Sequence, residues 1–198
     1  MNRYRLEADQ QRFSIARSIL RVLLGRQVDL NPIDIHFTDI FNKKPRLKDF
    51  AHVHHSVSHS GDWIVIAIAG SPVGIDVEKV DSNFFFPDVV AHSFSQAEKE
   101  YIENNDSPRT RFYQLWTRKE ALAKAKGHGI DDNFYRIPSI DGTHNVEKEP
   151  PYFTENWAIS GFNVAGEYLA AIAYRLETTR QAIHFFNVDP DLLSSQSV

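Results

Sequence analysis

The sequence predicts an α+β protein made of two similar halves, each with a long helix and a small antiparallel sheet. Three observations predict this class. Apolar residues recur at helical spacing over 10–27, and capping signals mark a second long helix over 107–127. Short β-branched runs separated by turn signals indicate strands. Each half also ends a hairpin with an Ala/Ile-rich strand, at 63–70 and 167–177, which suggests an internal repeat.

In the first half, the helix over 10–27 should bury Phe13, Ala16, Leu20 and neighbouring leucines, with its arginines mostly on the other face. Further segments are expected in the order short strand 34–37, polar loop 42–50, strand 53–60 and buried strand 63–70. We expect the join between the halves near residues 70–73, which gives an N-terminal half of 1–72 and a C-terminal half of 73–198.

In the second half, the run 73–78 reads as a strand. Ser95 and Glu98 have the spacing of a capping box, and the long helix starts at Ser107 and stops at Gly127. Strand patterning returns at 156–160, 167–177 and 182–188.

The composition excludes several kinds of function. None of the 198 residues is cysteine, so disulfides, thiolate catalysis and Cys-ligated metal sites are excluded. The net charge of −4 gives no global attraction for nucleic acid or an anionic membrane. The N-terminus lacks a signal-peptide pattern, and the apolar run at 63–70 is too short to cross a bilayer. We expect a cytoplasmic enzyme or binding protein with no nucleic-acid or membrane partner.

The strand 73–78 carries two acids where an apolar residue is expected. Side chains alternate along a strand, so Asp76 and Glu78 share one face, about 7 Å apart. On the long helix, Trp116, Glu120 and Lys124 follow one another at i, i+4 and i+8, which places them along one stripe. That stripe alone indicates an exposed ion pair beside a core Trp. Together with the strand acids, it favours a Mg²⁺ site with a lysine placed for a diphosphate substrate.

A third polar cluster lies at 52–61, where four histidines fall within eight residues. A zinc site is conceivable, but no HExxH helix supports it, and strand alternation puts His54 and His55 on opposite faces. The turn containing Ser58 and His59 could offer donors to a phosphate, or be a plain hairpin turn.

These motifs, in this order, resemble those of the 4′-phosphopantetheinyl transferase superfamily, specifically its surfactin-synthetase-activating type. The family's SHSG turn, GIDxE strand and WxxKEAxxKxxGxG helix correspond to residues 58–61, 74–78 and 116–129. The segment 94–102, FSQAEKEYI, matches the family's FS..E helix start. The ordered set covers about residues 12–130 and is highly specific.

The resemblance implies two α/β halves in a pseudo-twofold arrangement, with coenzyme A bound at the seam. Mg²⁺ would be held by Asp76, Glu78 and Glu120 and would bridge the diphosphate. The enzyme would transfer the phosphopantetheine arm to a serine of an acyl or peptidyl carrier protein and release 3′,5′-ADP. A chain with both halves is expected to act as a monomer.

The resemblance also implies roles for individual residues. Lys124 would stabilise charge on the leaving group, and Glu98 or Glu120, or a metal-bound hydroxide, would take the serine proton; the alternative for Glu98 is a purely capping role. Lys119 would steer phosphate or be solvated. The residues implied for coenzyme A are Arg12, Lys44, Pro45, Ser58, His59, Asp76, Lys119 and Lys124.

Two motifs depart from the family pattern. The family's GKP turn reads Lys43-Lys44-Pro45, and its FNISHS strand reads HSVSHS over 55–60.

Two other functions are consistent with the same residues. One is a Mg²⁺-dependent hydrolase of nucleotide diphosphates. The other is a carrier-protein-binding module without activity.

Overall fold

The computed structural model describes residues 7–38, 44–127, 133–140, 142–147, 154–176 and 182–188. The α-helices are α1 (Glu7–Val28), α2 (Pro87–Ser93), α3 (Gln96–Glu103) and α4 (Pro108–Lys126), with 3₁₀ turns η1 (Pro32–Asp34) and η2 (Phe134–Arg136). The strands are β1 (His54–Ser60), β2 (Trp63–Ala69), β3 (Val73–Lys79), β4 (Gly142–Glu147), β5 (Thr154–Ala165) and β6 (Tyr168–Arg175).

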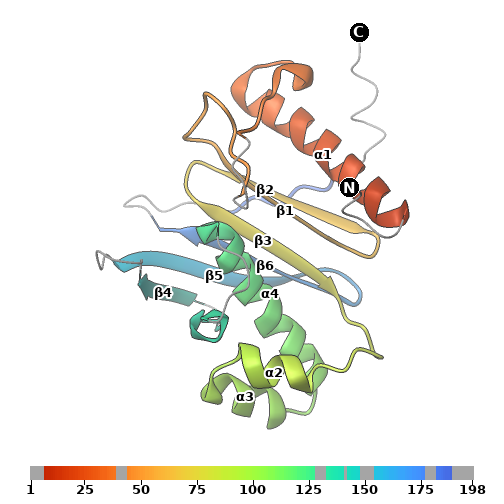
Figure 1. Cartoon of the computed structure of the whole chain (residues 1–198), viewed down its shortest axis with the longest axis vertical. Helices are drawn as coiled ribbons and strands as arrows, with labels where there is room; N and C mark the ends of the chain where they lie inside the picture. Colours follow the sequence, from red (N-terminus) through yellow and green to blue (C-terminus); the bar gives the residue numbers. More distant parts are fainter. Residues whose placement is uncertain are drawn as a thin grey trace.

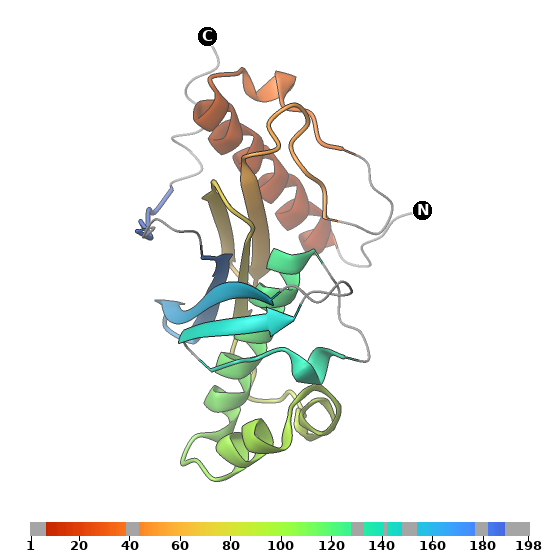
Figure 2. The same ribbon diagram turned by 90° about the vertical axis from the view of Figure 1, so that its left-hand side faces the viewer.

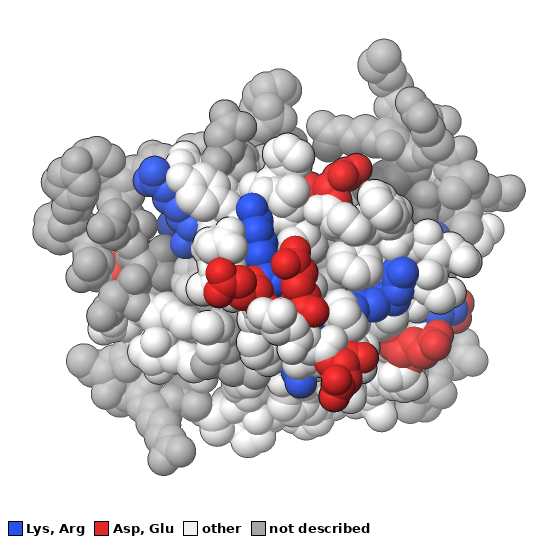
Figure 3. Space-filling view, turned by 90° about the horizontal axis from the view of Figure 1, so that it is seen from below, with Lys and Arg blue, Asp and Glu red and all other residues white. Residues whose placement is uncertain are grey.

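The strands form two antiparallel sheets, which confirms the α+β class (Figure 1). One sheet is the hairpin β1–β2, and the other has the order β3-β6-β5-β4. Helix α1 lies beside the hairpin, and α4 runs across the larger sheet. Figure 2 shows the same order from the side, with α1 at one end of the molecule and α2 and α3 at the other. Seen from that second end, acidic and basic side chains lie interspersed (Figure 3).

Helix α1 is anchored by apolar residues of its second half. Leu20 and Leu24 pack with Ile35, Leu47 and Val53, against partly buried residues of β1 and β2. The strand expected at 34–37 does not form. Asn31 caps the 3₁₀ turn that begins at Pro32, and Phe37 makes only an isolated bridge to Leu47. The early Asn-Pro signal therefore fixes a helical turn at 32–34, after which Ile35 is extended and Phe37 makes its isolated bridge.

Strand β2 is less buried than its apolar sequence predicts. Ala67 is its one buried residue, because the hairpin is covered by α1 on one side and leaves much of β2 half-exposed. Strand β3, by contrast, is buried from Val73 to Val77, including Asp76. The strand that carries the acids is therefore buried, although it lies at the edge of its sheet.

Helix α4 packs backbone to backbone on β3. An added Cβ at Gly74 would lie 1.9 Å from the carbonyl oxygen of Ala121 and 2.4 Å from the amide nitrogen of Ala125. Only glycine permits this approach. Farther along the sheet, α4 buries Leu122 together with Trp157 of β5. The contact at Gly74 sets how closely the residues of α4 approach those of β3.

The helix boundaries follow the expected capping signals. Ser95 and Glu98 form both bonds of a capping box, and Gly127 ends α4 in the left-handed region with φ of 75°. Ser107 occupies the N-cap position of α4 as predicted, but its hydroxyl makes no capping bond. The segment 182–188 is not a strand, while α2 and β4 form where no element was predicted. None of the helices within the described ranges has the length and apolar character to traverse a bilayer.

Candidate active site

Asp76, Glu78 and Glu120 converge on one cavity, although they come from a strand and a helix. The cavity has a volume of about 350 Å³. Asp76 and Glu78 reach it from the same face of β3, and Glu120 and Lys124 reach it from successive turns of α4. The complete lining is Val57, Ser58, His59, Asp76, Glu78, Trp116, Glu120 and Lys124. The structure therefore brings together the three acids and the lysine singled out in the sequence.

Asp76 is the most deeply buried of the three acids, with 2% of its surface exposed. Its Oδ1 lies 2.6 Å from Lys124 Nζ and accepts a hydrogen bond of 2.7 Å from the Ser58 hydroxyl. Lys124 Nζ also donates to Ser58 Oγ at 2.9 Å, which closes a triangle. Asp76 Oδ2 is buried without a hydrogen-bond partner. Because a buried carboxylate oxygen left without a partner is costly, this atom is available for a ligand.

The cavity holds more negative charge than its surroundings compensate. Burial, opposed in part by Lys124, raises the pKa of Asp76 above its usual value. Burial and the proximity of Asp76 raise the pKa of Glu78 to about 7 and also raise the pKa of Glu120. A cation among the three carboxylates would relieve both effects. Within the described ranges, no group of three or more histidine, aspartate or glutamate side chains is positioned to hold a metal ion without rearrangement.

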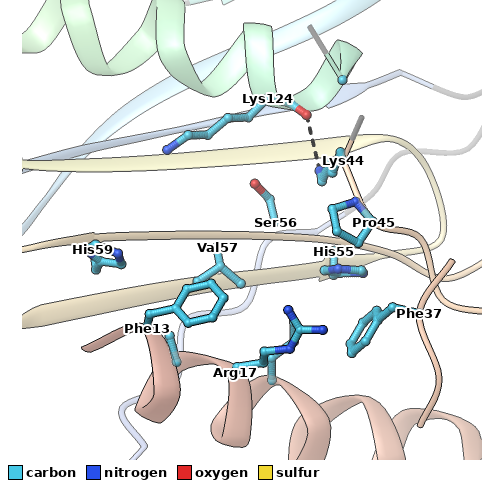
Figure 4. A pocket seen from close by; sticks show the side chains of 13 residues that line it. Phe13, Arg17, Phe37, Lys44, Pro45, His55, Ser56, Val57, His59 and Lys124 are labelled. Atoms are coloured by element: carbon cyan, nitrogen blue, oxygen red, sulfur yellow. Dashed lines mark hydrogen bonds between the residues drawn. The ribbon is translucent and has the colours of Figure 1, made fainter. Parts of the chain in front are cut away.

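A second, larger cavity adjoins the first, with a volume of about 460 Å³. Val57, His59 and Lys124 line both cavities, so they form the boundary between them. Figure 4 shows that the larger cavity is enclosed by α1 on one side and by β1 and the end of α4 on the others. Its lining is Phe13, Ala16, Arg17, Leu20, Phe37, Lys44, Pro45, His55, Ser56, Val57, His59, Lys124 and Gly127.

Lys44 connects the larger cavity to both neighbouring elements. Its ammonium group donates to the carbonyl oxygen of Val73 at 2.7 Å and to that of Lys124 at 3.3 Å, the latter drawn in Figure 4. Burial and the nearby charge of Lys124 lower the pKa of Lys44 to about 8. Lys44 and Pro45 thus both line the larger cavity, which adjoins the cavity with the acids. Lys43 and Gly129, which belong to the matched motifs, lie outside the described residues.

Most residues of the larger cavity were not predicted as functional, and four of these, Phe13, Arg17, Phe37 and His55, form one aromatic and basic wall. Phe13 was assigned to a core face of α1, but it is partly exposed at the cavity, as is Arg17. The Arg17 guanidinium lies 5.8 Å from the ring centre of Phe13 and 5.5 Å from that of Phe37. His55 packs edge-on against Phe37, and burial lowers the pKa of His55 to about 4. Two signals in the sequence point to this wall: Arg17 four residues after Phe13 on the apolar stripe of α1, and the histidines of 52–61.

Arg12, in contrast, lies outside the linings of both cavities. It donates from Nη1 to the carbonyl oxygen of Gly61 at 3.4 Å, and so links α1 to the turn between β1 and β2.

Glu98 and Lys119 form a buried ion pair away from both cavities. Lys119 Nζ lies 3.0 Å from Glu98 Oε2, and the lysine is 0% exposed, so the reading of a solvated Lys119 is wrong. Lys119 also donates to carbonyl oxygens at the end of η2, including that of Ile137, and Ser139 donates to Glu98. Burial lowers the pKa of Lys119. The pair joins α3, α4 and the segment after η2.

Comparison with known proteins identifies the family of this chain. The family model of the 4′-phosphopantetheinyl transferase superfamily matches residues 72–173, which contain all three acids. The 4′-phosphopantetheinyl transferase Sfp of Bacillus subtilis is 29% identical over 73% of this chain and 66% of its own. A further 4′-phosphopantetheinyl transferase of Bacillus subtilis is 30% identical over 86% and 76% of the two chains. A putative 4′-phosphopantetheinyl transferase of Synechocystis sp. is 34% identical over 80% and 67%.

The chain therefore belongs to the 4′-phosphopantetheinyl transferase superfamily, and it is a transferase of the Sfp-like type. It spans about two thirds to three quarters of the length of these relatives. The solved structure of holo-[acyl-carrier-protein] synthase from Neisseria meningitidis covers 54% of this chain and 98% of its own, with 14% identity and a TM-score of 0.39.

Proposed function

We propose that this protein transfers the 4′-phosphopantetheine arm of coenzyme A to a serine of an acyl or peptidyl carrier protein and releases 3′,5′-ADP. The observation that carries this proposal is the pair of adjoining cavities. One gathers three carboxylates and a lysine, and the other offers aromatic, cationic and apolar surface. A diphosphate ester of a nucleoside requires both kinds of surface side by side.

In this proposal the nucleotide of coenzyme A occupies the larger cavity. Phe13 and Phe37 contribute aromatic surface around the base, and Arg17 and His59 contribute donors to phosphate. The diphosphate would then extend past His59 and Lys124 into the cavity with the acids. Pro45 and Ser58 would line its path, and Lys44 would contribute positive charge from the boundary with β3.

Asp76, Glu78 and Glu120 fit a Mg²⁺ ion, because they supply oxygen ligands and one of them has a buried oxygen without a partner. Bound there, the ion would neutralise charge on the diphosphate oxygens. The hydrolysis of coenzyme A without any acceptor would need the same residues, so the experiment below separates the two reactions.

The residues of the chain account for the remaining chemistry. The carrier serine attacks the β-phosphorus, a new P–O bond forms, and the bond to the bridging oxygen of 3′,5′-ADP breaks. Lys124 lies at the boundary of the two cavities, where it can stabilise negative charge on the departing phosphate. Glu120 faces the same cavity, so its carboxylate lies where it could accept the serine proton.

For Glu98 and Lys119 we propose a supporting role. The two side chains form an ion pair with each other. Ser139 also donates to Glu98, and Lys119 also donates to backbone carbonyls, so both charged groups are engaged. They hold α4 against α3, and α4 in turn presents Glu120 and Lys124. Arg12 would support the turn after β1 through Gly61.

The experiment is intact-mass analysis of apo carrier proteins with coenzyme A and Mg²⁺. Transfer adds one phosphopantetheine to the carrier, and the Asp76→Asn variant should lose this addition while keeping its circular dichroism spectrum. Normal modification by Asp76→Asn contradicts the metal assignment. Release of phosphopantetheine from coenzyme A alone identifies a hydrolase instead.

We also propose that the two halves of the chain meet between residues 72 and 73. The protein would act as a monomer in the cytoplasm. Size-exclusion chromatography checks the monomer, and cell fractionation checks the location.

A further inference from the structure

Strands β1 and β3 run side by side at the seam between the two sheets (Figure 1), yet among the described strands each forms its ladder with another partner. Serine hydroxyls at alternate positions of β1 cross the gap instead. Ser56 Oγ accepts from the Ile75 amide at 3.1 Å, and Ser58 Oγ donates to Asp76. Ser60 Oγ donates to Glu78 Oε2 at 3.0 Å.

The hydroxyl of Ser60 is fixed in place from two directions. It also accepts a hydrogen bond of 3.0 Å from the amide of Lys79, the residue after Glu78. A serine hydroxyl has one proton to donate, and here that proton goes to the carboxylate. The backbone of β3 thus positions the hydroxyl, and the hydroxyl positions the carboxylate.

We propose that Ser60 is a positioning residue that holds the Glu78 carboxylate in the orientation needed to bind the metal ion. This inference rests on the proposed function, in which Glu78 belongs to the metal site. Ser60 lies outside the residues that line the acidic cavity, so it acts through Glu78 and not on substrate.

A physical reason for such a residue lies in the glutamate side chain. Glutamate has three rotatable bonds, and ordering it when the metal binds costs conformational entropy. A hydroxyl that already holds one carboxylate oxygen reduces this cost before the metal arrives. Partners of this kind behind a ligand commonly change metal affinity.

The test compares single hydroxyl deletions on one strand. Ser60→Ala removes the bond to the carboxylate. Ser56→Ala is the matched control for Mg²⁺ binding without coenzyme A, because Ser56 bonds a backbone amide of β3 and lines the larger cavity rather than the acidic one. Isothermal titration calorimetry with Mg²⁺ alone should show ~10-fold weaker binding for Ser60→Ala. Ser56→Ala should keep the affinity of the parent protein, and Ser60→Thr, which retains the hydroxyl, should restore it.

A second measurement separates positioning from folding. With coenzyme A and a carrier protein, Ser60→Ala should need ~10-fold more Mg²⁺ for half-maximal transfer and reach the parent rate at saturation. Unchanged Mg²⁺ affinity in Ser60→Ala, equal losses in both alanine variants, or a parent protein that binds no Mg²⁺ overturns the inference. Transfer by the parent protein is scored separately and decides the proposed function by itself.

Discussion

The metal-free protein should become more stable when Glu78 loses its charge. In Glu78→Gln, the amide oxygen can still accept the hydrogen bond from Ser60, while the buried negative charge disappears. Burial, together with the nearby Asp76, raises the pKa of Glu78 from 4.5 to about 7. At 1.36 kcal/mol per pKa unit, the ionised carboxylate destabilises the folded state by at most about 3 kcal/mol.

The sign and the pH range follow from proton binding. Below pH 4.5 Glu78 is protonated in both the folded and the unfolded state, so its charge costs nothing. As the pH rises towards about 7, the unfolded chain loses the proton first, and the folded state is progressively destabilised. Above about 7 the full cost remains. Glu78→Gln should therefore be more stable by about 1–3 kcal/mol at pH 8, and by less than about 0.5 kcal/mol at pH 4.5.

Urea denaturation of both proteins in EDTA, at pH 4.5 and pH 8, measures these differences. Glu100→Gln is the control, because Glu100 is an exposed glutamate of α3 and its removal should change the stability by less than about 0.5 kcal/mol at either pH. A gain for Glu78→Gln that is equal at both pH values, or absent at pH 8, refutes the assignment of a buried, uncompensated charge. Mg²⁺ should stabilise the parent protein more than the variant.

Two further substitutions test the packing that supports the site. Gly74→Ala should destabilise the fold by about 3 kcal/mol or more in urea denaturation, since its Cβ would overlap the Ala121 carbonyl oxygen; near-parent stability would show that α4 can shift away. Lys119→Met should cost about 3–5 kcal/mol because it leaves the Glu98 carboxylate buried without its partner. Adding Glu98→Gln to Lys119→Met should recover part of that loss, and a double variant as unstable as the sum of the singles would argue against a coupled pair.

Much of the acidic cavity was predictable because it depends on local rules. Strand alternation places Asp76 and Glu78 on one face, and helical spacing places Glu120 one turn from Lys124. The close packing of α4 on β3 also depends on a feature visible in the sequence, because Gly74 has no Cβ. Local patterns do not show that β3 and α4 pack against each other. That expectation came from the resemblance to a family.

The surroundings of the site were not predictable from local patterns. Lys119 resembles a surface lysine in the sequence, because its partner Glu98 lies on another helix and its carbonyl acceptors lie beyond α4. Phe13 has the spacing of a core residue, but it is 38% exposed and borders a cavity. The segment 34–37 has a strand-like composition, yet the Asn31 cap and Pro32 start a 3₁₀ turn there. In each case the deciding contact is distant in the sequence or involves the backbone.

The seam between the two sheets has a consequence for how the protein unfolds. Separate side-chain hydrogen bonds from the serines of β1 and from Lys44 cross the seam. Within each sheet, by contrast, a backbone ladder joins the strands into one cooperative unit. The β1–β2 hairpin with α1 can thus open while the larger sheet stays protected from hydrogen exchange. A ligand that lies across the seam contacts both the hairpin with α1 and the larger sheet. When it is bound, the amide hydrogens of these two parts should exchange in one cooperative transition instead of two.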